Sequence, residues 1–191
     1  MTSREMTTPV PTRPREAELR RVATRLFRER GFHATSMQDL AEALGMNRGS
    51  LYHYIDSKDD LLWWIVDGTL ERLRASVEPI LASDAPGAER LRTAIDAHLT
   101  FAAENVDEMS LVQIELRSLS EDRRRELLAE RDAYEHRWRE ALQTAVDEGT
   151  VRALDIRLTV AYFASHLTPL SSCSAPCPGS GVCPSIAFPW R

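Results

Sequence analysis

The chain has 191 residues, of which 43% are hydrophobic and 28% are charged. This composition is typical of a folded protein and excludes a disordered or fibrous one. Its net charge of −5 is uneven, because residues 1–60 carry ten basic and nine acidic side chains and the rest of the chain carries the negative excess, so only the first third could face phosphate.

No run approaches the roughly 18 uncharged apolar residues of a membrane span, and residues 1–14 lack the apolar stretch of a signal peptide. We therefore expect a cytoplasmic protein without a membrane partner. Residues 1–12 show no periodicity and predict a flexible arm. An amphipathic helix follows, because apolar residues recur at helical spacing, and Gly31 is placed to end it: Leu19, Val22, Ala23, Leu26 and Phe27.

Short capping patterns predict the next two helices. Ser36 and Asp39 have the spacing of a capping box that opens a second helix, which Gly45 ends after barely two turns. Asn47 is a natural N-cap for a third helix that runs to about Ile55. Caps at such short intervals indicate short helices joined by sharp turns.

Helical periodicity continues to about residue 165. Ser57 and Asp60 repeat the capping-box spacing and predict a long fourth helix that fades near residues 79–86. Further helices are predicted around residues 91–102, 106–119, 121–148 and 156–163, of which 106–119 is apolar nearly all round and is expected to be buried. From Leu167 onward the pattern ends, since this tail contains all three cysteines and five of the ten prolines.

The segment Met37–Asp56 fits a helix-turn-helix, in which a small residue in the first helix and a glycine in the turn let two short helices cross closely. Ala41 and Gly45 occupy those places. The exposed part of the third helix is then left to meet the major groove of DNA, whereas Tyr54 is expected to face the core.

The stretch GFHATSMQDLAEALGMNRGSLYHYIDSKDDLL, residues 31–62, resembles the signature of the tetracycline-repressor (TetR) family. The resemblance implies an all-α protein with a three-helix DNA-binding domain over residues 13–57 and a helical effector-binding and dimerisation domain over 58–165. The composition sets residues 166–191 apart as an irregular tail. The resemblance also implies a transcriptional regulator, most often a repressor, and not an enzyme. One departure is Ile55, where the family usually has phenylalanine; an aliphatic residue should still fill the core.

The same resemblance implies a DNA-contact set. Arg48 can reach a guanine edge or a phosphate, and Gly49 lets the helix backbone approach the groove. Further contacts are implied for the hydroxyl and imidazole groups of the third helix, for two helix N-termini and for the first basic residues: Ser50, Tyr52 and His53; Thr35, Ser36 and Lys58; Arg13 and Arg15.

For the helical domain the resemblance implies a small apolar or amphipathic effector, no cofactor, and a homodimer that reads a palindromic operator in double-stranded DNA. Polar and aromatic residues of its helices are candidate effector contacts: His98, Arg117, Tyr134 and Trp138. Periodicity alone shows only that such residues are buried, so a purely structural role stays open for each.

The tail allows two interpretations. His166, Cys173, Cys177 and Cys183 could hold zinc in a protein that binds partners through its helices, although a second close pair of ligands is missing. We favour the other interpretation, a C-terminus altered from about His166 onward, as a frameshift would produce. Because the family dimerises through its last two long helices and the prolines prevent the second one, a weak dimer or a monomer is expected.

Overall fold

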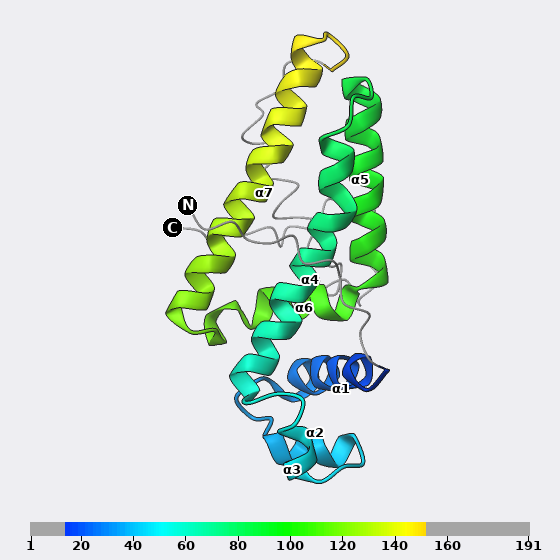
Figure 1. The fold of residues 1–191 in the computed structure, drawn as a ribbon. Coiled ribbons are helices and arrows are strands. Elements are labelled where there is room, and N and C mark those ends of the chain that lie inside the picture. The colour runs from blue at the N-terminus through cyan, green and yellow to red at the C-terminus, as the bar shows by residue number, and fades with distance from the viewer. Residues whose placement is uncertain (1–13, 152–191) are drawn as a thin grey trace, which may run out of the picture.

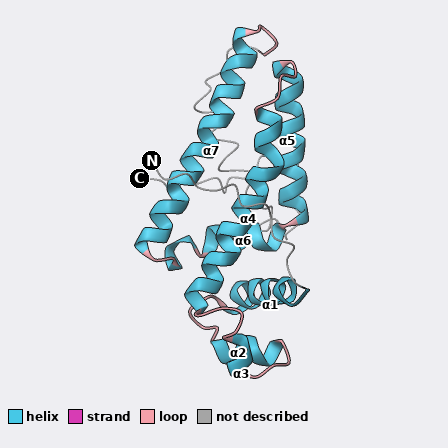
Figure 2. Cartoon of the chain, in the orientation of Figure 1, coloured by secondary structure: helices cyan, strands magenta, loops and turns pink. Residues whose placement is uncertain are grey.

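The structure, a computed structural model, describes residues 14–151, and every regular element among them is helical (Figures 1 and 2). The all-α fold expected from the sequence is confirmed for this part of the chain, and none of its helices is long and apolar enough to cross a membrane. The arm, the helix expected over 156–163 and the tail with its candidate zinc ligands lie outside the described residues. In chain order the elements are α1 (Pro14–Arg30), α2 (Met37–Ala43), α3 (Arg48–Leu51), α4 (Lys58–Leu81), α5 (Gly87–Glu104), α6 (Val106–Ile114), the 3₁₀ helix η1 (Leu116–Ser118) and α7 (Glu121–Asp147).

Helices α1, α2 and α3 form a unit at one end of the molecule, and α4 leads from this unit into a bundle with α5 and α7 (Figure 1). Each of these three long helices packs against the other two. Helix α6 lies at the base of the bundle, where it contacts both α1 and α4. The continuous α4 and the short α6 therefore both connect the three-helix unit to the bundle.

The turns of the three-helix unit are set by the residues that the sequence singled out. Gly31 and Gly45 have φ angles of 86° and 63°, in the left-handed region where a side chain is strained. The capping box at Ser36 is present in full, and the side chain of Asn47 accepts a hydrogen bond from the Ser50 amide at 2.7 Å. These local interactions fix the start of α2, the turn after it and the start of α3.

The third helix is shorter than predicted. It ends at Leu51 instead of continuing to Ile55, because the amides of His53 and Tyr54 donate to carbonyls three residues back and so tighten the chain into turns. Ile55 is half-buried and packs against the core, as expected of an aliphatic residue at that position.

Two apolar cores hold the described residues together. The first combines α1, α2, α3 and the start of α4 with Leu111, Leu119 and Leu127, and therefore joins the three-helix unit to α6 and α7. The second lies between α4, α5 and α7 and includes Leu73, Val77, Leu91, Ala141 and Leu142. Burying such side chains is the main stabilising contribution to both units.

The prediction that residues 106–119 are buried is wrong for much of the segment. Met109, Ser110 and Leu111 are buried, but Ile114 is 63% exposed and Val106 is also exposed. Helix α6 contacts its neighbours on only one side, so an apolar sequence there does not imply burial all round.

Candidate nucleic-acid interface

Helices α2 and α3 have the geometry of a helix-turn-helix. Leu40, Ala41 and Leu51 are completely buried, and Leu44 is nearly so. The Met46 amide donates to the Ala41 carbonyl at 3.0 Å, which closes the turn around Gly45. The apolar faces of both helices are thus used for packing, and the remaining face of α3 is free to contact another molecule.

The residues expected on that face are exposed as predicted, with one exception. Arg48, Gly49 and His53 are exposed, Tyr52 is 40% exposed, and Ser50 is half-buried. The Arg48 Nη2 donates to the Tyr52 hydroxyl at 2.9 Å, and the guanidinium lies 5.5 Å from the centre of the Tyr52 ring. Tyr52 therefore holds the Arg48 fork in one orientation, which lowers the entropy cost of a contact with a base edge.

Tyr54 was expected in the core, and that prediction is wrong, since its side chain is 42% exposed. Because α3 ends at Leu51, Tyr54 lies in a turn and not on the helix face opposite Tyr52. Its phenol adds a hydroxyl to the exposed surface beside α3, which helical periodicity could not have indicated.

The groups at the N-terminus of α2 that were expected to contact phosphate mostly form hydrogen bonds within the chain. Thr35 is buried, its hydroxyl donates to the Gly31 carbonyl at 2.9 Å, and its amide donates to the Phe32 carbonyl at 3.3 Å. Ser36 is exposed, but its amide donates to Asp39 at 2.8 Å and its hydroxyl caps the helix. Thr35 is therefore a structural residue, and the hydrogen bonds from Ser36 hold the pKa of the Asp39 carboxyl below its usual value.

Lys58 also has a structural role in place of the expected phosphate contact. Its ammonium donates to the carbonyls of Phe32 and Thr35, both at 2.8 Å, and lies 4.4 Å from the centre of the Phe32 ring. A third carbonyl, that of His33, lies at 3.4 Å. All three donors of the ammonium are used to fix the start of α4 to the turn between α1 and α2. Arg15 likewise turns inward, because its Nη2 donates to the Leu44 carbonyl at 3.2 Å, whereas Arg13 lies outside the described residues.

Polar contacts join the three-helix unit to α6. Arg28 forms an ion pair with Asp107, and Arg20 lies 4.0 Å from Glu108. Arg20 also donates to the carbonyls of Trp64 and Ile65 in α4, at 3.2 and 3.1 Å. Arg20 of α1 is thus held by both α4 and α6. Burial lowers its pKa from the ordinary value, with Glu108 opposing that shift.

Three of the four candidate effector residues meet inside the bundle. His98 of α5 is 5% exposed, and its Nδ1 lies 2.9 Å from the Tyr134 hydroxyl of α7. The Trp138 ring packs edge-on against both rings. The buried Nε2 of His98 has no hydrogen-bond partner, and burial lowers the pKa of His98 to about 4, so the ring is neutral at pH 7. Arg117 lies outside this cluster, exposed on η1, which argues against the expectation that it acts with the other three.

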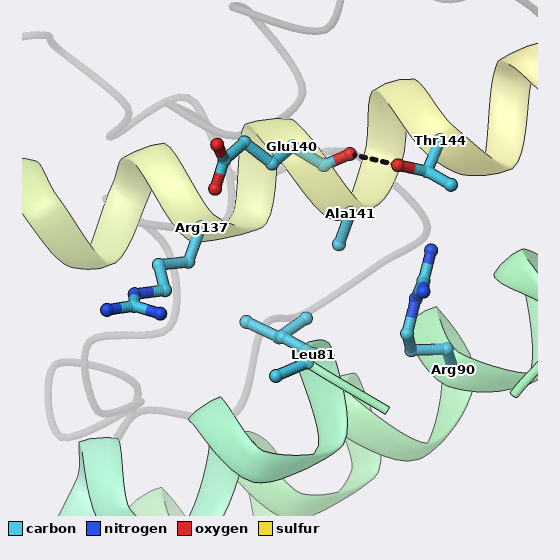
Figure 3. Close-up of a pocket in the computed structure, with 7 residues that line it drawn as sticks. Leu81, Arg90, Arg137, Glu140, Ala141 and Thr144 are labelled. Atoms are coloured by element: carbon cyan, nitrogen blue, oxygen red, sulfur yellow. Dashed lines mark hydrogen bonds between the residues drawn. The ribbon is translucent and has the colours of Figure 1, made fainter. Parts of the chain in front are cut away.

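A pocket of about 150 Å³ lies elsewhere in the bundle, between the end of α4, the start of α5 and the later turns of α7 (Figure 3). None of the four candidate effector residues lines it. Its lining residues are Leu81, Ala82, Arg90, Arg137, Glu140, Ala141 and Thr144. The sequence does not indicate this site, because nothing in the local pattern around Arg90 distinguishes it from the exposed arginines of the chain.

The chain matches two family descriptions in the order that the fold suggests. Residues 19–63 match the bacterial regulatory proteins of the tetR family, and residues 84–171 match a tetracyclin repressor-like C-terminal domain. The first range covers the helix-turn-helix and the start of α4, and the second covers α5, α6 and α7.

Individual proteins agree with these matches. The chain is 32% identical over 153 residues to the HTH-type transcriptional repressor KstR2 of Rhodococcus jostii, covering 78% of this chain and 72% of that protein. A TetR family transcriptional regulator, PfmR from Thermus thermophilus, superposes with a TM-score of 0.71 at 35% identity, covering 78% of this chain and 81% of PfmR. The structure of AibR in complex with isovaleryl coenzyme A and operator DNA gives a TM-score of 0.68 at 26% identity, with 81% and 84% of the two chains covered.

The geometry of the site and the similar proteins indicate the same class of function. A helix-turn-helix exposes Arg48 and Tyr52 at one end of a helical bundle, and the similar proteins are transcriptional regulators, not enzymes. The chain belongs to the TetR family and is a DNA-binding transcriptional regulator.

Proposed function

We propose that this protein is a ligand-responsive repressor that binds a palindromic operator as a dimer, with α3 in the major groove. The observation that carries the proposal is the exposed Arg48 and Tyr52 pair, in which a hydrogen bond of 2.9 Å orients the guanidinium. Such a fork can donate two hydrogen bonds to the O6 and N7 atoms of a guanine or contact a phosphate. The proposed surface also includes Gly49, Ser50 and His53. We add Tyr54, which was not predicted to be exposed.

The repressor role is supported by KstR2 of Rhodococcus jostii, which is a transcriptional repressor. We propose a small apolar or amphipathic effector and no further cofactor. AibR supports the amphipathic alternative, since its complex contains isovaleryl coenzyme A together with operator DNA. In this chain we place the apolar part of the effector beside His98, Tyr134 and Trp138, where the unpartnered Nε2 of His98 could accept or donate one hydrogen bond.

The effect of a ligand bound in the bundle could be transmitted to the three-helix unit through α6. The contacts of α6 with α1, namely Arg28 with Asp107 and Arg20 with Glu108, would have to change if the bundle expands around a ligand. In the proposed scheme the effector favours a bundle geometry in which the two α3 helices of the dimer no longer match their half-sites.

The unusual tail affects dimerisation more than any other part of the proposed function. We propose a homodimer that is weaker than is typical of the family, in accordance with the expectation drawn from the prolines after residue 167. A cytoplasmic location is part of the same proposal. Sedimentation of the full chain at micromolar concentration tests the weak dimer. A monomer or a concentration-dependent mixture supports the weak dimer, and a tight dimer contradicts it.

The operator function is tested by selecting bound sequences from a random pool of double-stranded DNA and measuring affinity for the selected site. A palindromic consensus with half-sites about 34 Å apart is expected. Arg48→Ala should weaken binding roughly tenfold or more, because a bidentate base contact is worth about 1–3 kcal/mol. The matched control is Arg125→Ala on α7, since the Arg125 side chain is 70% exposed and lies outside the α3 face.

Both variants should keep the helical content and melting temperature of the wild type. Affinity of the wild type should also fall as salt rises, because phosphate contacts release counterions. Equal affinity of Arg48→Ala and Arg125→Ala, or the absence of any selected sequence, would contradict the proposed α3 interface.

A further inference from the structure

The Arg90 side chain is half-buried and lies where α4, α5 and α7 meet. Arg90 lies in the first turn of α5, and its Nη1 donates to the Ser83 carbonyl at 3.0 Å, which fixes the side chain. Its Nε and Nη2 are buried and have no hydrogen-bond partner. No carboxylate in the described part of the chain forms an ion pair with it. Buried donors without a partner are costly, so a ligand that accepts from these two nitrogens would be favoured here.

The two unpaired donors share one edge of the planar guanidinium. Nε and Nη2 lie on the side away from the Nη1 that is bound to Ser83, and their N–H bonds are parallel. This is the edge with which arginine holds a carboxylate or a phosphate through two hydrogen bonds. A neutral ligand would satisfy the donors but not the charge.

The surroundings of Arg90 fit an anionic group with a small apolar neighbour. The guanidinium points from α5 toward Thr144 of α7, and Leu81 and Ala141 lie between it and Arg137 (Figure 3). The Glu140 carboxylate lies toward the Arg137 end of the pocket, where Glu78 is also found 3.8 Å from Arg137. Arg137 balances these carboxylates at the far end of the pocket, and the Glu148 carboxylate at the start of α5 accepts a hydrogen bond from the Gly87 amide at 2.7 Å without forming an ion pair with Arg90.

We propose that this pocket is an oxyanion-binding site, in which the Nε and Nη2 edge of Arg90 holds a carboxylate or phosphate group. Glu140 and Thr144 are exposed, so a ligand can enter from the surface beside α7. The pocket of about 150 Å³ has room for a small anion or for one anionic group of a larger molecule. The site shares no residue with α3 or with the cluster of His98, Tyr134 and Trp138, and it does not depend on the proposed function.

The test uses the full chain and two probes, sodium phosphate and sodium acetate, each compared with sodium chloride at equal ionic strength. Backbone amide NMR spectra of the wild type should show saturable shifts confined to residues 81–90 and 137–144. Arg90→Gln should weaken binding about tenfold or more, because a hydrogen bond to a charged partner is worth about that factor. The control Arg92→Gln, an exposed arginine of the same helix outside the pocket lining, should bind as the wild type does.

A second variant protects the test against misfolding of the first. Thr144→Phe is a substitution at an exposed position that places a ring over the Arg90 end of the pocket, and it should weaken binding to the same extent. Saturation by phosphate alone, or by acetate alone, supports the site and identifies the group that it accepts. Wild-type affinity in Arg90→Gln and Thr144→Phe, or shifts that do not saturate with either probe, would overturn the proposal.

Discussion

Lowering the pH from 7 to 5 should destabilise this protein through His98 in particular. Burial lowers the pKa of His98 from 6.5 to about 4, and the ring is only 5% exposed. In the unfolded chain the imidazole binds a proton near pH 6.5. Between these two values the unfolded state binds more protons than the folded state, so stability falls as the pH falls through this window. Below about pH 4 the loss from this group is complete.

The size of the effect follows from the two pKa values. The linkage relation gives a loss of about 2 kcal/mol between pH 7 and pH 5 from this residue, and about 3 kcal/mol when the whole window is crossed. Burial also raises the pKa of Tyr134 above its usual value, so the hydroxyl beside His98 stays neutral and offers no charge that could stabilise an imidazolium. A loss of about 2 kcal/mol is a large part of the stability of a typical domain.

The assay is urea unfolding followed by circular dichroism at pH 7 and pH 5, at one protein concentration because dimerisation would contribute to stability. The His98→Phe variant is the control, since it keeps a buried ring and removes the titrating group. Its overall stability can differ from that of the wild type, but it should lose about 2 kcal/mol less between the two pH values. Equal losses in both proteins, or a His98 pKa near 6.5 in an NMR titration, would refute the reasoning.

Three further predictions concern the DNA-facing unit. Lys58→Met should destabilise it by about 1–3 kcal/mol in urea unfolding, because three carbonyls lose a charged donor, while operator affinity of the folded variant stays close to wild type. Gly45→Ala should cost about 1 kcal/mol of stability through its φ of 63° alone, since no atom lies within 4 Å of an added Cβ. Gly49→Ala should leave the melting temperature unchanged or raise it, because alanine favours helix and its Cβ would meet Asn47 at an ordinary 3.4 Å, but it should weaken operator binding if the α3 backbone lies close to the groove. Unchanged stability of Lys58→Met or of Gly45→Ala, or unchanged operator affinity of Gly49→Ala, would contradict the corresponding prediction.

Local sequence determined most of the three-helix unit. The caps at Ser36, Asn47 and Ser57 and the glycines at 31 and 45 act over three or four residues, so their effect can be read without knowing the fold. The apolar spacing of α1 identified its buried face for the same reason, whereas Leu99, at a helical spacing in α5, is 48% exposed. The caps and the apolar spacing also predicted the exposed face of α3, with Arg48 and Tyr52.

Only the tertiary structure decided which polar groups are free to act. Lys58 and Thr35 looked available for phosphate, but carbonyls of the preceding turn take up their donors, and those partners lie up to 26 residues away. The converse holds for Arg90, which resembles any surface arginine in the sequence but has no acid partner among residues 14–151, where α4, α5 and α7 meet. Hydrogen bonding and desolvation depend on neighbours that are distant in the chain, and residue type and periodicity carry no record of them.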